Sequence, residues 1–416
     1  MIVTSRAAVP VFVCDLEITI GDRSVPGSVL HLGTVTVLTV QPHLLPPLLF
    51  IPRISTKHWI VGDEIELFSL NDEHQLVQKR TQISSICGVT TRQCNPPRWR
   101  ITNTEGISLL ECPYSNGGIL IDPVEKSVIA LWMVVTSQNS SGKNTSWKVG
   151  LSYDFYIRPV VESLRSGKDV ESRCSGWEFE HMQLSSAMSL GLTETRAVKI
   201  SSIAKSIGAV ARPIFVTGKL KPPSQTEDDL KIGDVILEIN GEPVGRMADT
   251  RCLSRLESAK ITVLRNGQEM EITVHTKPVL SQSTPRVICW AGAIVHETPS
   301  SVLEQTTPEF LRVSFREAIT HIEKAVYTSG VMYGSPAFGN LRPVHWILEI
   351  DGCKVRSLDD LLETISSLEE SEEYIRVKIL SRKGITSVVS VRLDSNFWTA
   401  WILERKGNNW VRRELE

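Results

Sequence analysis

The sequence lacks the features that mark a membrane, secreted or nucleic-acid-binding protein. No apolar run reaches the length of a membrane-spanning helix, and the first residues contain no long apolar stretch followed by a cleavage site. Basic and acidic residues are nearly equal, at 45 and 47 in 416, which argues against bulk attraction to nucleic acid or to a membrane surface. We therefore expect an unsecreted, intracellular protein with neither nucleic acid nor membrane among its partners.

Disulfide and metal patterns are also missing. The eight cysteines are scattered without a C-x-x-C pair, and this spacing predicts free thiols in a reducing compartment. No histidine or cysteine pair has the spacing of zinc ligands, so we expect no metal site and no cofactor. What remains is an ordinary globular composition, with 41% apolar residues and a length that favours about three domains.

The most informative feature that is present is a repeat. Residues 230–244 read as a Gly-Asp turn, a strand, an Asn-Gly tight turn and a re-entering strand. Residues 346–355 repeat the strand, the turn and the re-entry, with Asp-Gly in the turn. The turn glycines Gly241 and Gly352 lie 111 residues apart (352 − 241), which corresponds to one small domain per copy.

Each copy continues with a helix and a strand hairpin. In the second copy, Ser357 can cap a helix with one apolar face at i, i+3, i+4 and i+7, formed by Leu358, Leu361, Leu362 and Ile365. The first copy has a weaker helix over residues 246–258 and then a hairpin with Asn266-Gly267 in its turn. The same order of elements, occurring twice, predicts two copies of one domain.

This order resembles the PDZ domains of the HtrA family of serine proteases. Residues 175–179, SGWEF, look like the carboxylate-binding loop and strand that open such a domain, and residues 289–295, CWAGAIV, occupy the same place in the second copy. In the second copy, His345 and Trp346 replace the glycine and aspartate that precede the strand in the first.

Such a loop and its neighbouring helix form a groove that takes an extended peptide as an added strand. The resemblance therefore implies polypeptide segments or C-termini as partners. We expect binding mainly in the second domain, through Ala291, Gly292, Ala293, Ile294 and the helix residues Leu358, Leu361, Leu362 and Ile365. In the first domain the candidates are Gly176, Trp177 and Phe179, and Glu178 should disfavour a peptide carboxylate there. The alternative is that both copies are structural spacers with closed grooves.

The stretch SNGGILID, residues 115–122, resembles the nucleophile turn of a trypsin-like protease. Such enzymes place G-N/D-S-G-G before an apolar strand, so that the serine meets a histidine and backbone N–H groups face the oxyanion. Here the glycine pair is kept, Asn116 stands at the nucleophile and Ser115 lies one place early. Using Ser115 would shift the nucleophile by about 3.8 Å along the chain, which is more than catalytic geometry tolerates.

The other members of a catalytic triad must precede the nucleophile, because a trypsin-like chain has its histidine and then its aspartate upstream of the serine. The candidates are His31, His43, His58 and His74, with Asp15, Asp22, Asp63 and Asp72. We expect surface or packing roles for the histidines. The prolines around His43 suit the edge of a barrel strand, and Asp63 follows a glycine in a predicted turn. A complete triad is therefore not expected.

The whole chain is similar to the second half of the double-length HtrA proteases of fungi, the nuclear pro-apoptotic serine protease group, in which the second protease domain is degenerate. This resemblance implies a mainly β fold with α+β modules. We expect a truncated trypsin-like β-barrel remnant at residues 1–165, PDZ-like domains at 175–278 and 287–395, and a C-terminal tail at 396–416.

The same resemblance implies a non-catalytic scaffold or peptide-binding protein, in the nucleus or otherwise in the cytoplasm. The alternative is a serine endopeptidase of the HtrA family, active through Ser115 or only together with an N-terminal half absent from this sequence. A homo-oligomer is compatible with the sequence.

Overall fold

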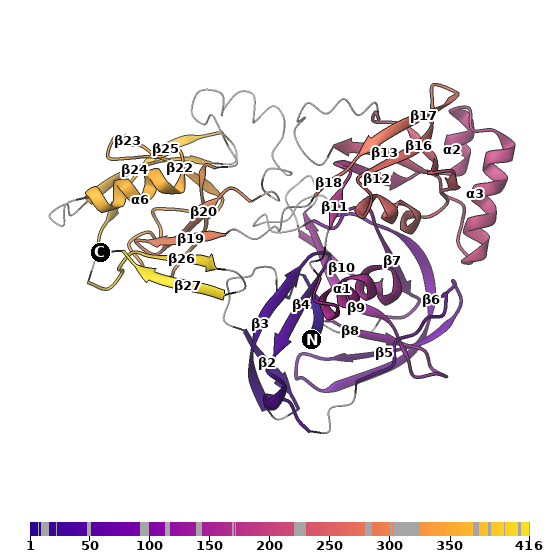
Figure 1. The fold of residues 1–416 in the computed structure, drawn as a ribbon, viewed down its shortest axis with the longest axis horizontal. Coiled ribbons are helices and arrows are strands. Elements are labelled where there is room, and N and C mark those ends of the chain that lie inside the picture. The colour runs from indigo at the N-terminus through magenta and orange to yellow at the C-terminus, as the bar shows by residue number, and fades with distance from the viewer. Residues whose placement is uncertain are drawn as a thin grey trace. The chain divides into compact units, whose positions relative to one another are not determined.

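The computed structural model divides the chain into two compact units. The N-terminal unit comprises residues 1–94 and 99–281, and the C-terminal unit comprises residues 282–416 with 95–98. The structure describes all residues except 7, 10–15, 22, 48–50, 92–99, 113–116, 139–143, 169, 171, 220–229, 279–284, 300–301, 303–323, 369–373, 382–383, 395, 407–408 and 416. Both units are dominated by strands, as expected from the sequence (Figure 1).

The N-terminal unit opens with a four-stranded antiparallel sheet. Its strands lie in the order β1 (Ile2–Ser5), β4 (Val35–Val40), β3 (Arg23–Leu32) and β2 (Leu16–Ile20). Val35, Val37 and Leu38 of β4 are buried, and the chain then enters a one-turn 3-10 helix, η1 (Pro42–Leu44). The described strands of this sheet do not close into a barrel.

A closed six-stranded barrel follows. Its strands are β5 (Glu64–Leu70), β6 (Leu76–Val89), β7 (Thr104–Leu109), β8 (Gly118–Ile121), β9 (Val128–Gln138) and β10 (Asn144–Ser152), closed in the order β10-β7-β6-β5-β8-β9. Ile65, Leu67, Leu120 and Trp132 fill the core. A one-turn π-helix, η2 (Tyr153–Ile157), and the helix α1 (Arg158–Arg165) leave the barrel and carry Ile157 and Val161 into a second core cluster.

Arg6, which directly follows β1, lies near His31 of β3. Arg6 is 3% exposed, and its guanidinium donates to the Gly33 carbonyl. Burial, reinforced by the positive charge of Arg6, lowers the pKa of His31 to about 4. The fold therefore favours the neutral imidazole, and the unfolded chain binds more protons than the folded chain between the unfolded pKa near 6.5 and pH 4.

We predict that the stability of the N-terminal unit falls by about 3 kcal/mol through His31 as the pH drops from 6.5 to 4. The contribution is fully present above pH 6.5 and is lost through that window, because the unfolded chain then takes up a proton that the folded chain, with its neutral imidazole, does not. A His31→Gln variant should not show this part of the loss. Urea unfolding at pH 7, 5 and 4 measures the difference, and an identical pH dependence in the two proteins would contradict the prediction.

The first PDZ-like domain completes the N-terminal unit. Its sheet has the order β12 (Trp177–His181), β13 (Ile214–Lys219), β14 (Val235–Ile239), β16 (Ser258–Arg265) and β17 (Gln268–His275), with β15 (Glu242–Pro243) beside β14. The helices are α2 (Leu184–Ser189), α3 (Glu194–Ser206) and the 3-10 helix η3 (Met247–Ser254), and a small ladder joins β11 (Arg173–Cys174) to β18 (Lys277–Pro278). The weak helix predicted over residues 246–258 is thus the shorter η3.

The C-terminal unit is built on one long sheet. The order is β25 (Thr386–Arg392), β24 (Tyr374–Ser381), β22 (His345–Ile350), β21 (Val326–Val331), β20 (Ala293–Glu297), β19 (Arg286–Trp290), β26 (Trp401–Lys406) and β27 (Asn409–Glu414), with β23 (Cys353–Lys354) beside β22. The helix α6 (Leu358–Ser367) begins after Ser357, whose hydroxyl accepts a hydrogen bond from the Asp360 N–H as predicted.

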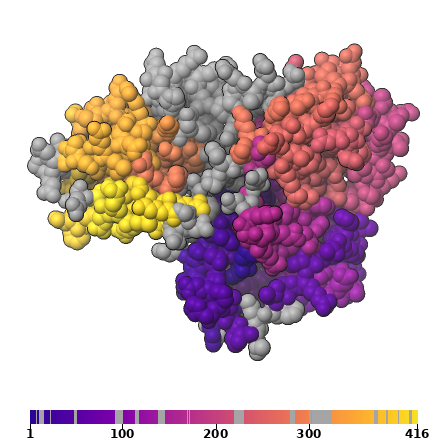
Figure 2. Space-filling model, in the orientation of Figure 1, coloured from indigo at the N-terminus to yellow at the C-terminus, as the bar shows by residue number. Residues whose placement is uncertain are grey.

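The expected C-terminal tail is part of this sheet. β26 pairs with β19, with Ile402 opposite Ile288, and both of these side chains are fully buried. In the space-filling view, the yellow residues of the β26–β27 hairpin lie directly against the orange residues of the same unit (Figure 2). The prediction of a tail was wrong because β26 depends on a partner strand about a hundred residues earlier in the chain, which no local pattern reveals.

The register of the second repeat also differs from the prediction by one residue. The glycine place of the first copy, Gly233 with φ +95°, is taken by Val344 with φ +68°. The two residues make equivalent hydrogen bonds to the neighbouring strand. Gly233 N–H donates to the Val216 carbonyl, and Val344 N–H donates to the Thr328 carbonyl. His345 therefore replaces the aspartate, not the glycine, and a β-branched residue holds a left-handed conformation that normally suits glycine.

None of the helices in the described ranges is long and apolar enough to cross a membrane.

Candidate functional site

The predicted nucleophile turn leads into the wall of the closed barrel. Asn116 and Ser115 lie outside the described residues. The glycine pair that follows them is described, and β8 pairs with β5 on one side and β9 on the other. Gly118 has no room for a side chain, since a Cβ atom there would lie 2.2 Å from the Phe68 carbonyl oxygen. The glycine of this motif is thus required by the barrel itself.

The barrel histidines occupy separate environments. His31 is placed beside Arg6, His58 lies 6.3 Å from the Phe155 ring, and His74 is in the β5–β6 turn with φ +60°. His43 is exposed on η1, which corrects its predicted place at a strand edge, because Pro42 has the fixed φ that suits a helix start. Among the described residues, none of these four histidines is hydrogen-bonded to a carboxylate.

Of the candidate aspartates, only Asp63 and Asp72 are among the described residues, and neither is hydrogen-bonded to one of these histidines. The Asp63 carboxylate accepts a hydrogen bond from the Ile60 N–H at 3.1 Å, as expected for a turn residue. Asp72 is placed in the exposed β5–β6 turn, and Asp15 and Asp22 lie outside the described residues. No triad geometry is assembled by the described residues of the barrel.

In the second PDZ-like domain, β20 is paired on both edges. β21 pairs with one edge, and β19 pairs with the other, with Trp290 opposite Ala293 and Cys289 opposite Ile294. Ala291 and Gly292 have φ of +50° and +80° and form the tight turn between β19 and β20. The predicted carboxylate loop is therefore a hairpin turn, and β19 takes the place of an added peptide strand.

The helix face predicted to line that groove belongs to the core. Leu358 and Leu361 are 1% and 0% exposed and pack with Ile288 and Val295, while Leu362 and Ile365 are partly buried against the same cluster. An ion pair of 2.7 Å between Arg286 of β19 and Asp359 of α6 joins the inserted strand to the helix. This corrects the prediction of an open groove here, because residues 286–290 form a strand of the sheet before the presumed loop begins.

In the first PDZ-like domain, β12 pairs with β13 alone among the described strands. Its outer edge carries the Trp177 carbonyl and the Phe179 N–H, and both are bonded by one side chain of the barrel. Asn103 donates from Nδ2 to the Trp177 carbonyl and accepts at Oδ1 from the Phe179 N–H, each at 2.8 Å. A side-chain amide has the donor and acceptor of a peptide group, so Asn103 makes the two bonds that an added strand would make.

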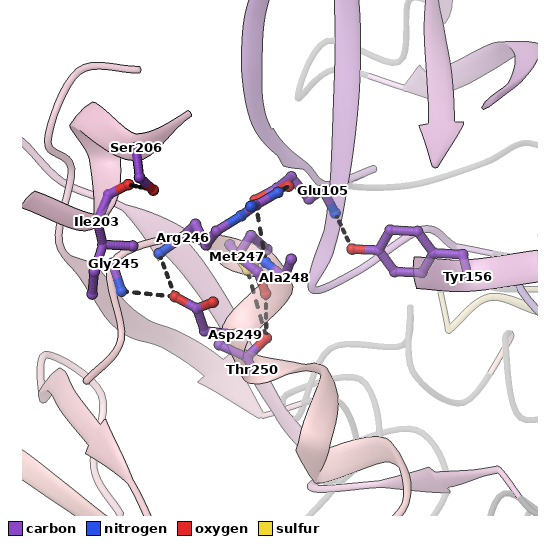
Figure 3. A network of polar contacts seen from close by, with 10 residues as sticks. All are labelled: Glu105, Tyr156, Ile203, Ser206, Gly245, Arg246, Met247, Ala248, Asp249 and Thr250. Atoms are coloured by element: carbon purple, nitrogen blue, oxygen red, sulfur yellow. Dashed lines mark hydrogen bonds and ion pairs between the residues drawn. The ribbon is translucent and has the colours of Figure 1, made fainter. Parts of the chain in front are cut away.

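Charged residues flank this contact. Two residues past Asn103, the buried Glu105 carboxylate accepts from Arg246 Nε at 3.1 Å and from the Ala248 N–H at 3.3 Å, and its second oxygen also contacts Arg246 (Figure 3). Three residues before Asn103, Arg100 forms a 2.8 Å ion pair with Glu178, and the two side chains are only 9% and 16% exposed. Glu178, expected to repel a peptide carboxylate, is thus neutralised from within the chain.

The start of η3 is held by further bonds. The Asp249 carboxylate accepts from the N–H groups of Gly245 and Arg246 at 2.9 Å each, and Glu105 N–H donates to the Tyr156 hydroxyl at 2.7 Å (Figure 3). Burial raises the pKa of Tyr156 well above its ordinary value, with the Glu105 charge adding to the effect, so the hydroxyl stays protonated.

A cavity of about 390 Å³ lies beside η3, on the side of Phe155. The guanidinium carbons of Arg246 and Arg251 lie 5.1 and 5.0 Å from the centre of the Phe155 ring. Burial, and then the charge of Arg255, lowers the pKa of Arg251. This corner of the N-terminal unit is therefore rich in positive charge, and Glu105 pairs with the guanidinium of Arg246.

The predicted carboxylate loop of the first domain makes local bonds. Gly176 N–H donates to Cys174 Sγ at 3.2 Å, and Trp177 N–H donates to Ser175 Oγ at 3.3 Å. The side chains of Trp177 and Phe179 are 4% and 1% exposed and belong to the domain core. Sequence reasoning placed these residues near the groove but missed Asn103, whose role depends on a contact between segments 74 residues apart.

No cluster of three or more histidine, cysteine or acidic side chains suitable for a metal ion occurs in the described residues. Cys87, Cys252, Cys289 and Cys353 are free thiols.

Parts of this chain are similar to known proteins. Residues 192–264 match the PDZ domain family. Pro-apoptotic serine protease NMA111 of Coccidioides immitis is 26% identical over 415 residues, covering 96% of this chain, and that of Yarrowia lipolytica is 22% identical over 420 residues, covering 99%. Over nearly its whole length, the chain is similar to these pro-apoptotic serine proteases.

The chain spans 38% of the length of the first relative and 41% of the second. Among solved structures, the HtrA-type protease AlgW with tripeptide is 19% identical, with a TM-score of 0.43, over 66% of this chain and 85% of its own.

Proposed function

We propose that this HtrA-like chain is a non-catalytic scaffold that binds polypeptide segments, with a pseudoprotease barrel and tandem PDZ-like domains. The observation that carries the proposal is the outer edge of β12, where the main-chain groups of Trp177 and Phe179 are bonded by a side chain and not by a strand. Strand addition at such an edge is how PDZ domains take extended peptides.

Two observations support the absence of catalysis. In the sequence, Asn116 stands where the nucleophile would be, and in the described barrel the histidines lack carboxylate partners. In subtilisin, loss of the nucleophilic serine alone costs about a million-fold in kcat. A barrel that lacks both the nucleophile and the oriented base has no route to an acyl-enzyme.

The second candidate function is serine endopeptidase. It is favoured by the names of the relatives, which are serine proteases, and by the fraction of their length that this chain spans. In that case the activity of a longer protein would come from residues outside this sequence. The same names suggest a role in apoptosis. We propose a nuclear or cytoplasmic location from the resemblance of the sequence to the double-length HtrA proteases of fungi.

We predict that the purified chain neither hydrolyses unfolded casein nor reacts with a fluorophosphonate probe. Asn116→Ser alone should restore neither reaction, because a serine without an oriented histidine remains a poor nucleophile. Gel-based probe labelling measures this, with trypsin as the positive control. Labelling of the unmodified chain that disappears in a Ser115→Ala variant would overturn the non-catalytic proposal.

A further inference from the structure

We propose that residues 100–105, here called the latch segment, hold the groove of the first PDZ-like domain closed. We further infer that its external partner is an internal stretch of extended polypeptide with a basic side chain, and not a free C-terminus. The inference rests on the proposed function, since it assumes that β12 receives polypeptide, and it adds the regulation of that site and the chemistry of its partner.

The first step is the occupation of the strand edge. Asn103 bonds both main-chain groups that β12 offers between Trp177 and Phe179. It has φ +51°, a conformation that asparagine adopts more readily than most residues, so its side chain is aimed at β12 without unusual strain. An incoming strand must break both bonds before it can pair here, and it then replaces them with its own main-chain bonds.

The second step is the charge that the partner must meet. Glu178 carries its carboxylate on the strand that receives the partner, and Arg100 of the latch segment neutralises it at 2.8 Å. When Arg100 withdraws, this poorly exposed carboxylate loses its partner, which is costly unless another cation replaces it. A peptide with a lysine or arginine opposite Glu178 supplies that cation, whereas an acidic residue at the same place is repelled.

The third step excludes a free C-terminus. A terminal carboxylate needs unbonded N–H groups in the loop before β12. Here the N–H groups of Gly176 and Trp177 donate to Cys174 and Ser175, and Glu178 follows directly. The loop is therefore satisfied by its own side chains and is followed at once by a negative charge.

The fourth step is reversibility. Asn103 contributes two hydrogen bonds from one side chain, whereas β19 fills the second domain as a whole strand paired on both edges. Glu105 remains bonded to Arg246 at the start of η3. This contact can keep the barrel attached to the first PDZ-like domain while Asn103 releases β12 and Arg100 releases Glu178. The first groove can therefore open without separating the domains, and the second cannot.

The test uses the full chain and three variants. Asn103→Gly removes the amide and tolerates φ +51° without strain. Asn103→Asp still accepts from the Phe179 N–H but no longer donates to the Trp177 carbonyl. Asn266→Gly is the matched control, because Asn266 also has φ +51° and is exposed in the β16–β17 turn of the same domain.

The probe is the fluorescein-labelled peptide acetyl-TVTRVTV-amide, titrated by fluorescence anisotropy. We expect Asn103→Gly to bind it about tenfold more tightly than the unmodified chain and Asn266→Gly, since two hydrogen bonds no longer compete. Asn103→Asp should be intermediate. In Asn103→Gly, replacing the peptide arginine by glutamate should weaken binding about tenfold or more, and a free terminal carboxylate should give no gain.

Equal affinities for the unmodified chain and Asn103→Gly would overturn the latch while leaving polypeptide binding intact. No binding by any of the proteins, each verified as folded by circular dichroism, would overturn the latch and the proposed function together. Tighter binding of the free-carboxylate peptide would overturn the assignment of the partner.

Discussion

Replacing Glu105 by alanine should lower the free energy of unfolding of the N-terminal unit by about 3–5 kcal/mol, because it leaves a buried cation without its partner. Glu105 is 6% exposed, and the Arg246 side chain it contacts is 16% exposed. Arg251 lies on the same Phe155 ring, so the remaining charges would repel each other. The Ala248 N–H would also lose its acceptor.

Urea unfolding followed by circular dichroism measures this effect. The matched control is Glu64→Ala, whose partner Arg80 lies 3.6 Å away in a pair with 58% and 61% of the side chains exposed, and whose loss should stay within about 1 kcal/mol. A double variant of Glu105 and Arg246 to alanine should lose less than the sum of the single variants. Equal, small effects of Glu105→Ala and Glu64→Ala would show that this pair does not hold the barrel to the domain.

Ending the chain at residue 395 should unfold the second PDZ-like domain. The truncation removes β26 and β27, exposes the outer edge of β19 and takes Ile402 out of the core. An exposed apolar edge strand of this kind also favours aggregation. We expect the truncated chain to lose the cooperative unfolding transition of the C-terminal unit.

Single substitutions separate the core contribution from the loss of the hairpin. Ile402 is fully buried, and Ile402→Ala should cost about 2–5 kcal/mol. Val411 on the partner strand is 42% exposed, and Val411→Ala should cost less than about 1 kcal/mol. Thermal unfolding of the two variants gives the comparison. A chain ending at 395 that melts like the full chain would contradict the assignment of β26 to the domain core.

Local signals in this sequence predicted local structure well. Ser357 caps α6, and Asn240-Gly241 and Asn266-Gly267 form tight turns between paired strands, because these residue types favour those backbone conformations by themselves. The repeat also predicted two related sheets. The one-residue error at Val344 arose because a valine at positive φ gives no sequence signal of the turn it replaces.

The state of both grooves could not be predicted, because it depends on contacts between distant segments. Glu178 was recognised as a charge in the binding region, but its partner Arg100 lies 78 residues earlier, in the connection between two barrel strands. No sequence motif around Asn103 indicates that its side chain bonds to β12. In the second domain, the same stretch that resembles a binding loop becomes a hairpin turn once β26 pairs with β19. The local sequence pattern thus identified the type of domain. Contacts between distant segments determine which strand edge is available to a peptide.

Polypeptide should bind at β12 of the first PDZ-like domain and not at β20 of the second. Hydrogen–deuterium exchange of the full Asn103→Gly chain, with and without saturating acetyl-TVTRVTV-amide, tests it most directly. We expect slower exchange in residues 177–181, above all at the Phe179 amide that Asn103 no longer covers, and unchanged exchange in residues 293–297. Protection confined to residues 293–297, or none in residues 177–181 under saturation, would contradict it.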